Sequence, residues 1–65
     1  MGTTEEYNSK VLELARRCLE VAKTAPSDSL RRRWALDGLD LLNRLPLNYG
    51  DSKTLAARLR EEFKK

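Results

Sequence analysis

Two aspartates about one helical turn apart, Asp37 and Asp40, could suggest a catalytic carboxylate pair in this chain. Such pairs supply the general acid and the general base of many hydrolytic reactions. Here each aspartate has an arginine four residues away, Arg33 before Asp37 and Arg44 after Asp40, and this spacing brings opposite charges together on one helix face. We therefore interpret both carboxylates as members of solvated ion pairs.

The remaining residue types offer no other catalytic, metal or cofactor site. The chain has no histidine, and its one cysteine, Cys18, lies on the inward stripe of the first predicted helix, so an activated nucleophile lacks its base. Without histidine or a second cysteine, a zinc site with the usual ligands is excluded. The glycines are isolated from one another, which excludes a glycine-rich phosphate loop. We expect a non-enzymatic protein without cofactor or metal.

Cysteine content and hydropathy also bear on where the protein resides. A single cysteine excludes an intramolecular disulfide, which is typical of intracellular proteins. No apolar run approaches the roughly 20 residues of a membrane-spanning helix, and the N-terminus lacks the layout of a signal peptide. We therefore expect a soluble, cytoplasmic protein. Its net charge of +3 allows acidic partners without requiring nucleic acid.

The hydrophobic pattern predicts a first helix over residues 4–25. Thr3 and Glu6 form a capping-box signal at its start. Apolar residues then recur at alternating spacings of four and three, and a second set widens the apolar arc to roughly half of the circumference. The recurring set is Tyr7, Val11, Leu14, Cys18, Val21 and Ala25, and the second set is Leu12, Ala15, Leu19 and Ala22. Because Cys18 belongs to this arc, we interpret it as a small buried hydrophobe.

Two further helices are predicted after Pro26, which ends the first. Ser27 or Asp28 can cap a helix over residues 28–45, whose apolar arc of roughly 180° requires two neighbouring helices. This arc comprises Leu30, Trp34, Ala35, Gly38, Leu39, Leu41, Leu42 and Leu45. Pro46 ends that helix, and a third over residues 52–64 directs Leu55, Ala56, Leu59 and Phe63 inward. The chain is therefore predicted to form one domain over residues 1–65, an all-α antiparallel three-helix bundle.

Two residues of the second helix invite a functional interpretation. Gly38 lies on the apolar side, where glycine costs up to about 1 kcal/mol relative to alanine, so it indicates close approach of another helix. That helix could belong to the bundle or to a ligand. Leu36 projects among charged and polar residues, away from the other apolar side chains. It is either a contact hot spot or one of the single exposed leucines that are common on protein surfaces.

The run Arg31–Arg33 falls in what should be the first turn of the second helix, where the helix dipole favours acids. Together with Lys23, the side chains of Arg31, Arg32 and Arg33 could contact phosphates. A basic helical hairpin that dimerises is similar in layout to the nodavirus suppressors of RNA silencing, and this likeness implies binding of duplex RNA. Against it, consecutive residues project about 100° apart on a helix, so the three arginines cannot all face one ligand.

A basic strip on the third helix points to a different partner. Lys53, Arg60 and Lys64 project within roughly 40° of one another, with Ala57 beside them. A basic strip that borders small residues can hold an acidic amphipathic helix. The alternative is an ordinary solvated helix face.

Three segments together resemble the helices of a microtubule-interacting and trafficking domain. They are Lys10–Cys18, Trp34–Leu42 and Leu59–Phe63, and the resemblance covers residues 10–65. It implies a three-helix bundle that binds amphipathic helical tails, such as those of membrane-remodelling ESCRT proteins, in a groove beside the third helix. The residues that the resemblance places in this groove are Leu42, Lys53, Ala56, Ala57, Arg60 and Lys64.

We therefore expect a protein-interaction module that accepts an amphipathic helix beside its third helix. The alternative function is a nucleic-acid-binding protein, with a homodimer left open. A second alternative is a structural or designed bundle without a natural ligand groove, which could associate through its broad apolar faces because a core of this size is marginal.

Overall fold

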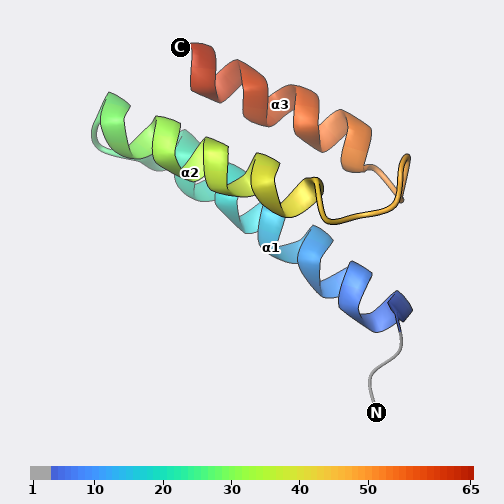
Figure 1. Ribbon diagram of the computed structural model, residues 1–65. Coiled ribbons are helices and arrows are strands. Elements are labelled where there is room, and N and C mark those ends of the chain that lie inside the picture. The colour runs from blue at the N-terminus through green and yellow to red at the C-terminus, as the bar shows by residue number, and fades with distance from the viewer. Residues whose placement is uncertain (1–3) are drawn as a thin grey trace.

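The computed structural model describes residues 4–65 and confirms the all-α three-helix bundle (Figure 1). Its helices are α1 (Thr4–Thr24), α2 (Asp28–Leu42) and α3 (Ser52–Lys64). Consecutive helices run antiparallel, and α2 packs against both α1 and α3, whereas α1 and α3 contact each other least. The predicted capping residue Thr3 lies outside the described residues. The bundle is flattened, with Cα extents of 39 × 21 × 13 Å.

Local chemistry explains both ends of α2. The Ser27 side chain caps the start, because its hydroxyl accepts the N–H of Leu30 at 3.2 Å. The end comes at Leu42, so the predicted end at residue 45 is wrong. Residues 43–45 instead form tight turns, in which Leu45 N–H donates to the Leu42 carbonyl at 3.1 Å. Pro46 is the cause, since the residue before a proline avoids the α conformation.

The core forms where small side chains of α1 and α2 meet α3. Leu59 is fully buried, and Ala15, Ala22 and Ala35 are also inaccessible to solvent. A Cβ atom at Gly38 would lie 2.9 Å from both Leu59 methyl carbons and 3.1 Å from Cys18 Cβ. The close approach that Gly38 indicated therefore occurs within the bundle, because two helices converge on a position with no side chain.

Cys18 is buried in this packing, which confirms its interpretation as a small hydrophobe. Burial raises the pKa of its thiol, and the nearby carboxylate of Asp37 raises that pKa further. Both effects disfavour the thiolate, which is the reactive form of cysteine. Cys18 is thus a packing residue here.

The two predicted apolar arcs are only partly covered. On α1, Leu12 is half-buried and five other residues of the predicted arc are buried: Val11, Ala15, Cys18, Leu19 and Ala22. Tyr7, Leu14 and Val21 are exposed, contrary to their predicted inward placement. On α2, Leu30 and Trp34 are likewise exposed, so the prediction that its whole arc is buried is wrong. A third helix of 13 residues covers one flank of the α1·α2 pair and leaves the other uncovered.

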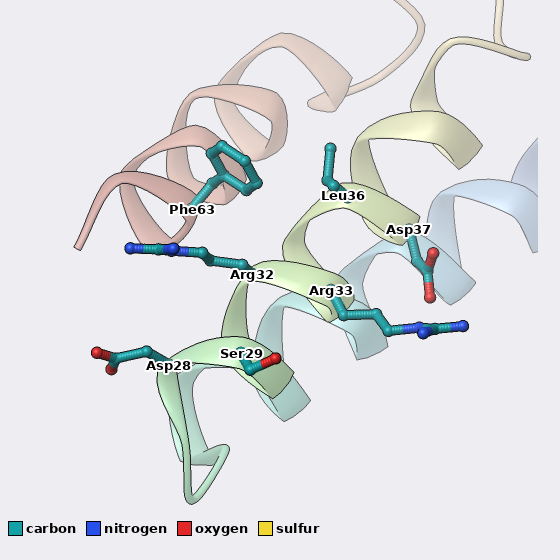
Figure 2. A pocket seen from close by; sticks show the side chains of 7 residues that line it. All are labelled: Asp28, Ser29, Arg32, Arg33, Leu36, Asp37 and Phe63. Atoms are coloured by element: carbon teal, nitrogen blue, oxygen red, sulfur yellow. The ribbon is translucent and has the colours of Figure 1, made fainter.

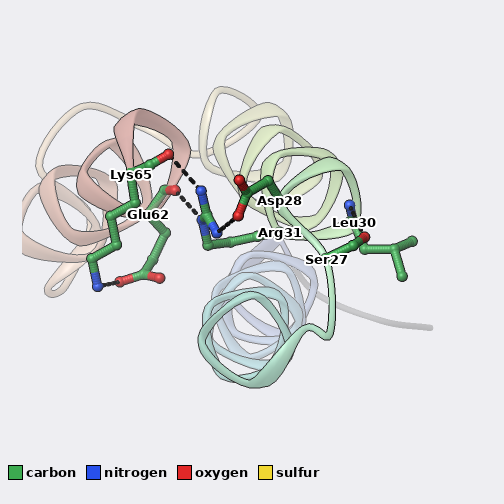
Figure 3. Close-up of polar contacts among 6 residues, drawn as sticks. All are labelled: Ser27, Asp28, Leu30, Arg31, Glu62 and Lys65. Carbon is green, nitrogen blue, oxygen red and sulfur yellow. Dashed lines mark hydrogen bonds and ion pairs between the residues drawn. The ribbon is translucent and has the colours of Figure 1, made fainter.

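Arg31 joins the start of α2 to the end of α3 (Figure 3). Its Nε donates to the Glu62 carbonyl at 2.9 Å and one terminal nitrogen donates to the Lys65 carbonyl at 2.5 Å. The other terminal nitrogen pairs with the Asp28 carboxylate at 2.6 Å. Carbonyls in the last turn of a helix lack intrahelical partners, so Arg31 satisfies two of them from another helix. This contact gives the first arginine of the run a structural role.

Replacing Arg31 with methionine should lower the free energy of unfolding by about 1–3 kcal/mol, because the two carbonyls lose a charged donor. Hydrogen exchange should accelerate most in the last turn of α3. Arg32→Met is the matched control, since Arg32 is exposed and makes no such bonds to α3 in residues 4–65. Urea unfolding followed by circular dichroism measures the difference, and equal stability of the two variants would contradict the role assigned to Arg31.

Candidate interaction groove

Two surface hollows lie along the junction of α2 and α3. One, of about 590 Å³, is at the end of α2 and the start of α3. The other, of about 760 Å³, is where α2 begins and α3 ends; Phe63 lines it from α3, and the residues that line it from α2 are Asp28, Ser29, Arg32, Arg33, Leu36 and Asp37. The residues around the first are Leu42, Asn43, Leu45, Pro46, Leu47, Asn48, Ser52, Lys53, Ala56 and Arg60. We call the two hollows together the α2·α3 groove.

Apolar side chains from both helices line this groove. Figure 2 shows Phe63 of α3 opposite Leu36 of α2, with Arg32 extending toward α3 beneath them. Leu36 is 52% exposed, which agrees with its predicted projection away from the core. Ala56 is half-buried in the other hollow, and Leu47 of the loop is almost entirely exposed beside it. The groove therefore offers apolar contact at both of its ends.

Four of the six predicted groove residues line the same hollow. Leu42 comes from α2, whereas Lys53, Ala56 and Arg60 come from α3. The other two, Ala57 and Lys64, are exposed and do not line either hollow. Helical projection places them on the outer side of Lys53 and Arg60, about 20–60° further from the core. Leu42, Lys53, Ala56 and Arg60 therefore border the groove, whereas Ala57 and Lys64 form an outer margin on α3.

Sequence reasoning missed two parts of the groove. Phe63 was predicted to point inward, but it is 37% exposed and forms the wall opposite Leu36. Its position at the edge of the apolar arc of α3 was the available signal. The loop residues 45–48 gave no such signal, since a loop has no periodicity from which a face can be inferred.

The predicted phosphate-binding residues are not brought together. Arg31 is bonded to the end of α3. Arg32 and Arg33 line the same hollow, but Arg32 extends toward α3 and Arg33 extends away from it (Figure 2). Lys23 of α1 pairs with Glu20 at 3.6 Å. These four cations therefore point in different directions, as the angle between consecutive helical residues requires.

Ion pairs and hydrogen bonds hold the groove walls in place. Arg16 of α1 pairs with Asp51 at 2.6 Å, which fixes the loop directly before α3. The Tyr49 hydroxyl in the same loop donates to Glu5 at 2.7 Å, and this bond raises the pKa of Tyr49. At the other end, the Arg31 guanidinium lowers the pKa of Asp28 through their hydrogen bond and charge. All three contacts stabilise the backbone that shapes the groove.

The aspartates near the groove behave as surface groups. Asp40 pairs with Arg44 at 3.8 Å, as predicted. The predicted pair between Arg33 and Asp37 does not form within 4 Å among the described residues. Nor do residues 4–65 contain a group of three or more potential metal-binding side chains. None of the described helices combines the length and apolar character needed to cross a membrane.

No protein-family model, curated protein or solved structure matches this chain. The likeness to the microtubule-interacting and trafficking domain therefore stays a prediction from the residues.

Proposed function

We propose that this protein is a non-enzymatic interaction module that binds an acidic amphipathic helix in the α2·α3 groove. The observation that supports this most directly is the joint placement of Leu42, Lys53, Ala56 and Arg60 around one hollow. Apolar contacts there can take the hydrophobic face of a helix, and the cations can contact its acidic side. The resemblance described above implies the same class of partner.

The dimensions of the groove favour a helical partner. Its two hollows lie at opposite ends of α3, which has 13 residues and is therefore about 20 Å long. A ligand helix of about 13 residues would run along α3 and span both, with one anchor near Ala56 and another near Phe63, about 10 Å further along. Positions i, i+3, i+4 and i+7 of such a helix present one continuous apolar face.

Charge sets the acidic character of the partner. Lys53 and Arg60 line the hollow at the end of α2, which no carboxylate lines, and Lys64 lies on the outer margin. The hollow at the start of α2 has Arg32 and Arg33 beside Asp28 and Asp37. None of these cations forms an ion pair within residues 4–65, so each is available to a partner carboxylate. Because they are exposed, their contribution should fall with rising salt.

Arg60→Glu should weaken binding of an acidic amphipathic peptide about fivefold, because one exposed charge contact is worth up to about 1 kcal/mol. The probe is a 14-residue helical peptide with leucines on one face and glutamates along both sides of it. Isothermal calorimetry gives the affinity, and thermal unfolding shows whether the fold is retained.

Arg58→Glu is the matched control. Arg58 is exposed on the same helix, but helical projection places it about 160° from Arg60 and away from the groove. We expect its affinity for the peptide to equal that of the unchanged protein. If Arg60→Glu and Arg58→Glu bind equally well, the groove is wrongly assigned. Short duplex RNA in place of the peptide tests the competing class of ligand.

A further inference from the structure

A second apolar surface lies on the other flank of α2. Leu14 and Val21 of α1 and Leu30 and Trp34 of α2 are each between 38% and 50% exposed. We call these four residues the α1·α2 face. Tyr7, one heptad before Leu14, continues it along α1 and is also exposed. Large apolar side chains that lie together and remain exposed mark an interaction surface.

Several contacts place this face away from α3. On α1, Leu12 lies against Gly50 and Arg16 pairs with Asp51, so that edge of the helix borders the loop before α3. Helical projection puts Leu14 and Val21 about 140–180° from these two residues. On α2, Figure 3 shows Leu30 on the side opposite to the Arg31 contacts with α3.

The exposed apolar residues of α1 and those of α2 border the same side of the α1·α2 contact. Asp37 lies close enough to the Cys18 thiol for its charge to raise the pKa of that group. Helical projection places Asp37 between Leu30 and the outer ridge of α2, and Cys18 between Leu14 and the core of α1. The α1·α2 face is therefore one surface. The wall of the groove that Leu36 and Phe63 form lies on the other flank of α2, and Asp37 lies between the two surfaces.

Charges of opposite sign flank this face. Lys10 and Arg17 surround Leu14 on α1, where together with Glu13 they line a shallow hollow of about 250 Å³. On the α2 side the flanking carboxylate is Asp37, which Figure 2 shows leaving the helix away from α3. Neither Lys10, Arg17 nor Asp37 forms an ion pair within residues 4–65. Both edges carry both signs, since Glu13 lies beside Lys10 and Arg17, and Arg33 lies beside Asp37 (Figure 2). The opposite charges that a second copy can bring together are Arg17 on the α1 edge and Asp37 on the α2 edge.

We propose that this face binds a second copy of the chain, with a two-fold axis parallel to the helices. Such an axis places α1 of each copy on α2 of the other, at the same height along the bundle. Gly38 lies level with Cys18, so Arg17 lies within about one turn of the height of Asp37. Each Arg17 then faces Asp37 of the other copy, and each Val21 faces Trp34.

Together, α1 and α2 of the two copies form a four-helix bundle in which every adjacent pair of helices is antiparallel. The face measures about 22 Å along α2 and about 20 Å across two helices, hence about 450 Å² for each copy. That is at the low end of specific interfaces, so the dimer dissociates on dilution. The hollow at the end of α2 stays open in the dimer, because Leu42, Lys53, Ala56 and Arg60 do not belong to the α1·α2 face, whereas the hollow at the start of α2 shares Asp37 with it.

A charge exchange between copies tests the proposal. Arg17→Asp and Asp37→Arg each place like charges opposite one another in a homodimer, so each variant alone should be a monomer. An equimolar mixture of the two restores both ion pairs in a mixed dimer. Sedimentation equilibrium between about 10 μM and 1 mM, which brackets the affinity expected of so small an interface, gives the mass of each sample.

Arg17 and Asp37 are both exposed, so each variant should keep its fold, and circular dichroism checks this. Trp34→Ala provides a second variant that removes apolar contact without a charge. The expected result is a dimer for the unchanged protein and for the mixture, and a monomer for each single variant. A monomeric unchanged protein at the highest concentration overturns the dimer, and a monomeric mixture overturns the proposed arrangement.

Discussion

Truncating Leu59 to alanine should lower the free energy of unfolding by about 2–5 kcal/mol and leave much of the chain unfolded at 37 °C. Leu59 is the largest side chain with no exposure among the described residues. Its methyl groups reach the backbone of α2 at Gly38, so the change leaves a void where the helices converge. A single core in a chain of this size rarely supplies more than about 3–5 kcal/mol.

The control for this prediction is Leu47→Ala. Leu47 is 92% exposed, so the same chemical change should alter stability by less than about 0.5 kcal/mol. Urea unfolding at one fixed protein concentration compares the two variants, because self-association would make the apparent stability depend on concentration. Similar unfolding midpoints for the two variants would show that Leu59 does not occupy the core position described.

Gly38→Val should destabilise the bundle by about 1–3 kcal/mol or more, although valine has the higher helix propensity. Even one added carbon would lie 2.9 Å from the Leu59 methyl carbons and 3.1 Å from Cys18 Cβ. Leu59 is fully enclosed and cannot move aside, so α2 would have to shift away from both neighbours. Gly38→Ala should show a smaller loss, which thermal and urea unfolding can measure.

A double substitution separates crowding from a general intolerance of change at Gly38. In the Leu59→Ala background, Gly38→Ala fills part of the void, so the two changes together should be less harmful than their sum by at least about 0.5 kcal/mol. Strict additivity would mean that the two side chains do not share the same space. The result bears on both proposed surfaces, since this contact positions α2 between them.

A small part of the groove could be predicted from the sequence. Lys53 and Arg60 recur at helical spacing, so their common face follows from the geometry of one helix, whereas Leu42 and Ala56 were placed beside them by the family resemblance. Phe63 and the loop residues 45–48 could not be assigned in this way. Their positions depend on how the chain turns after Leu42 and on how far α3 then covers α2.

The number, order and approximate limits of the helices followed from the amino-acid sequence, because periodicity, prolines and capping residues act over a few neighbouring positions. The sequence also predicted that Cys18 is buried and that another helix approaches Gly38, while the structure shows that this helix belongs to the bundle. Only the tertiary structure decided which flank of each broad apolar arc is covered, and it left Leu14, Val21, Leu30 and Trp34 exposed. It likewise divided the arginine run, bonding Arg31 to α3 while Arg32 and Arg33 diverge. An apolar arc indicates which side chains of a helix tend to be buried. Which helix covers them depends on contacts between residues far apart in the chain.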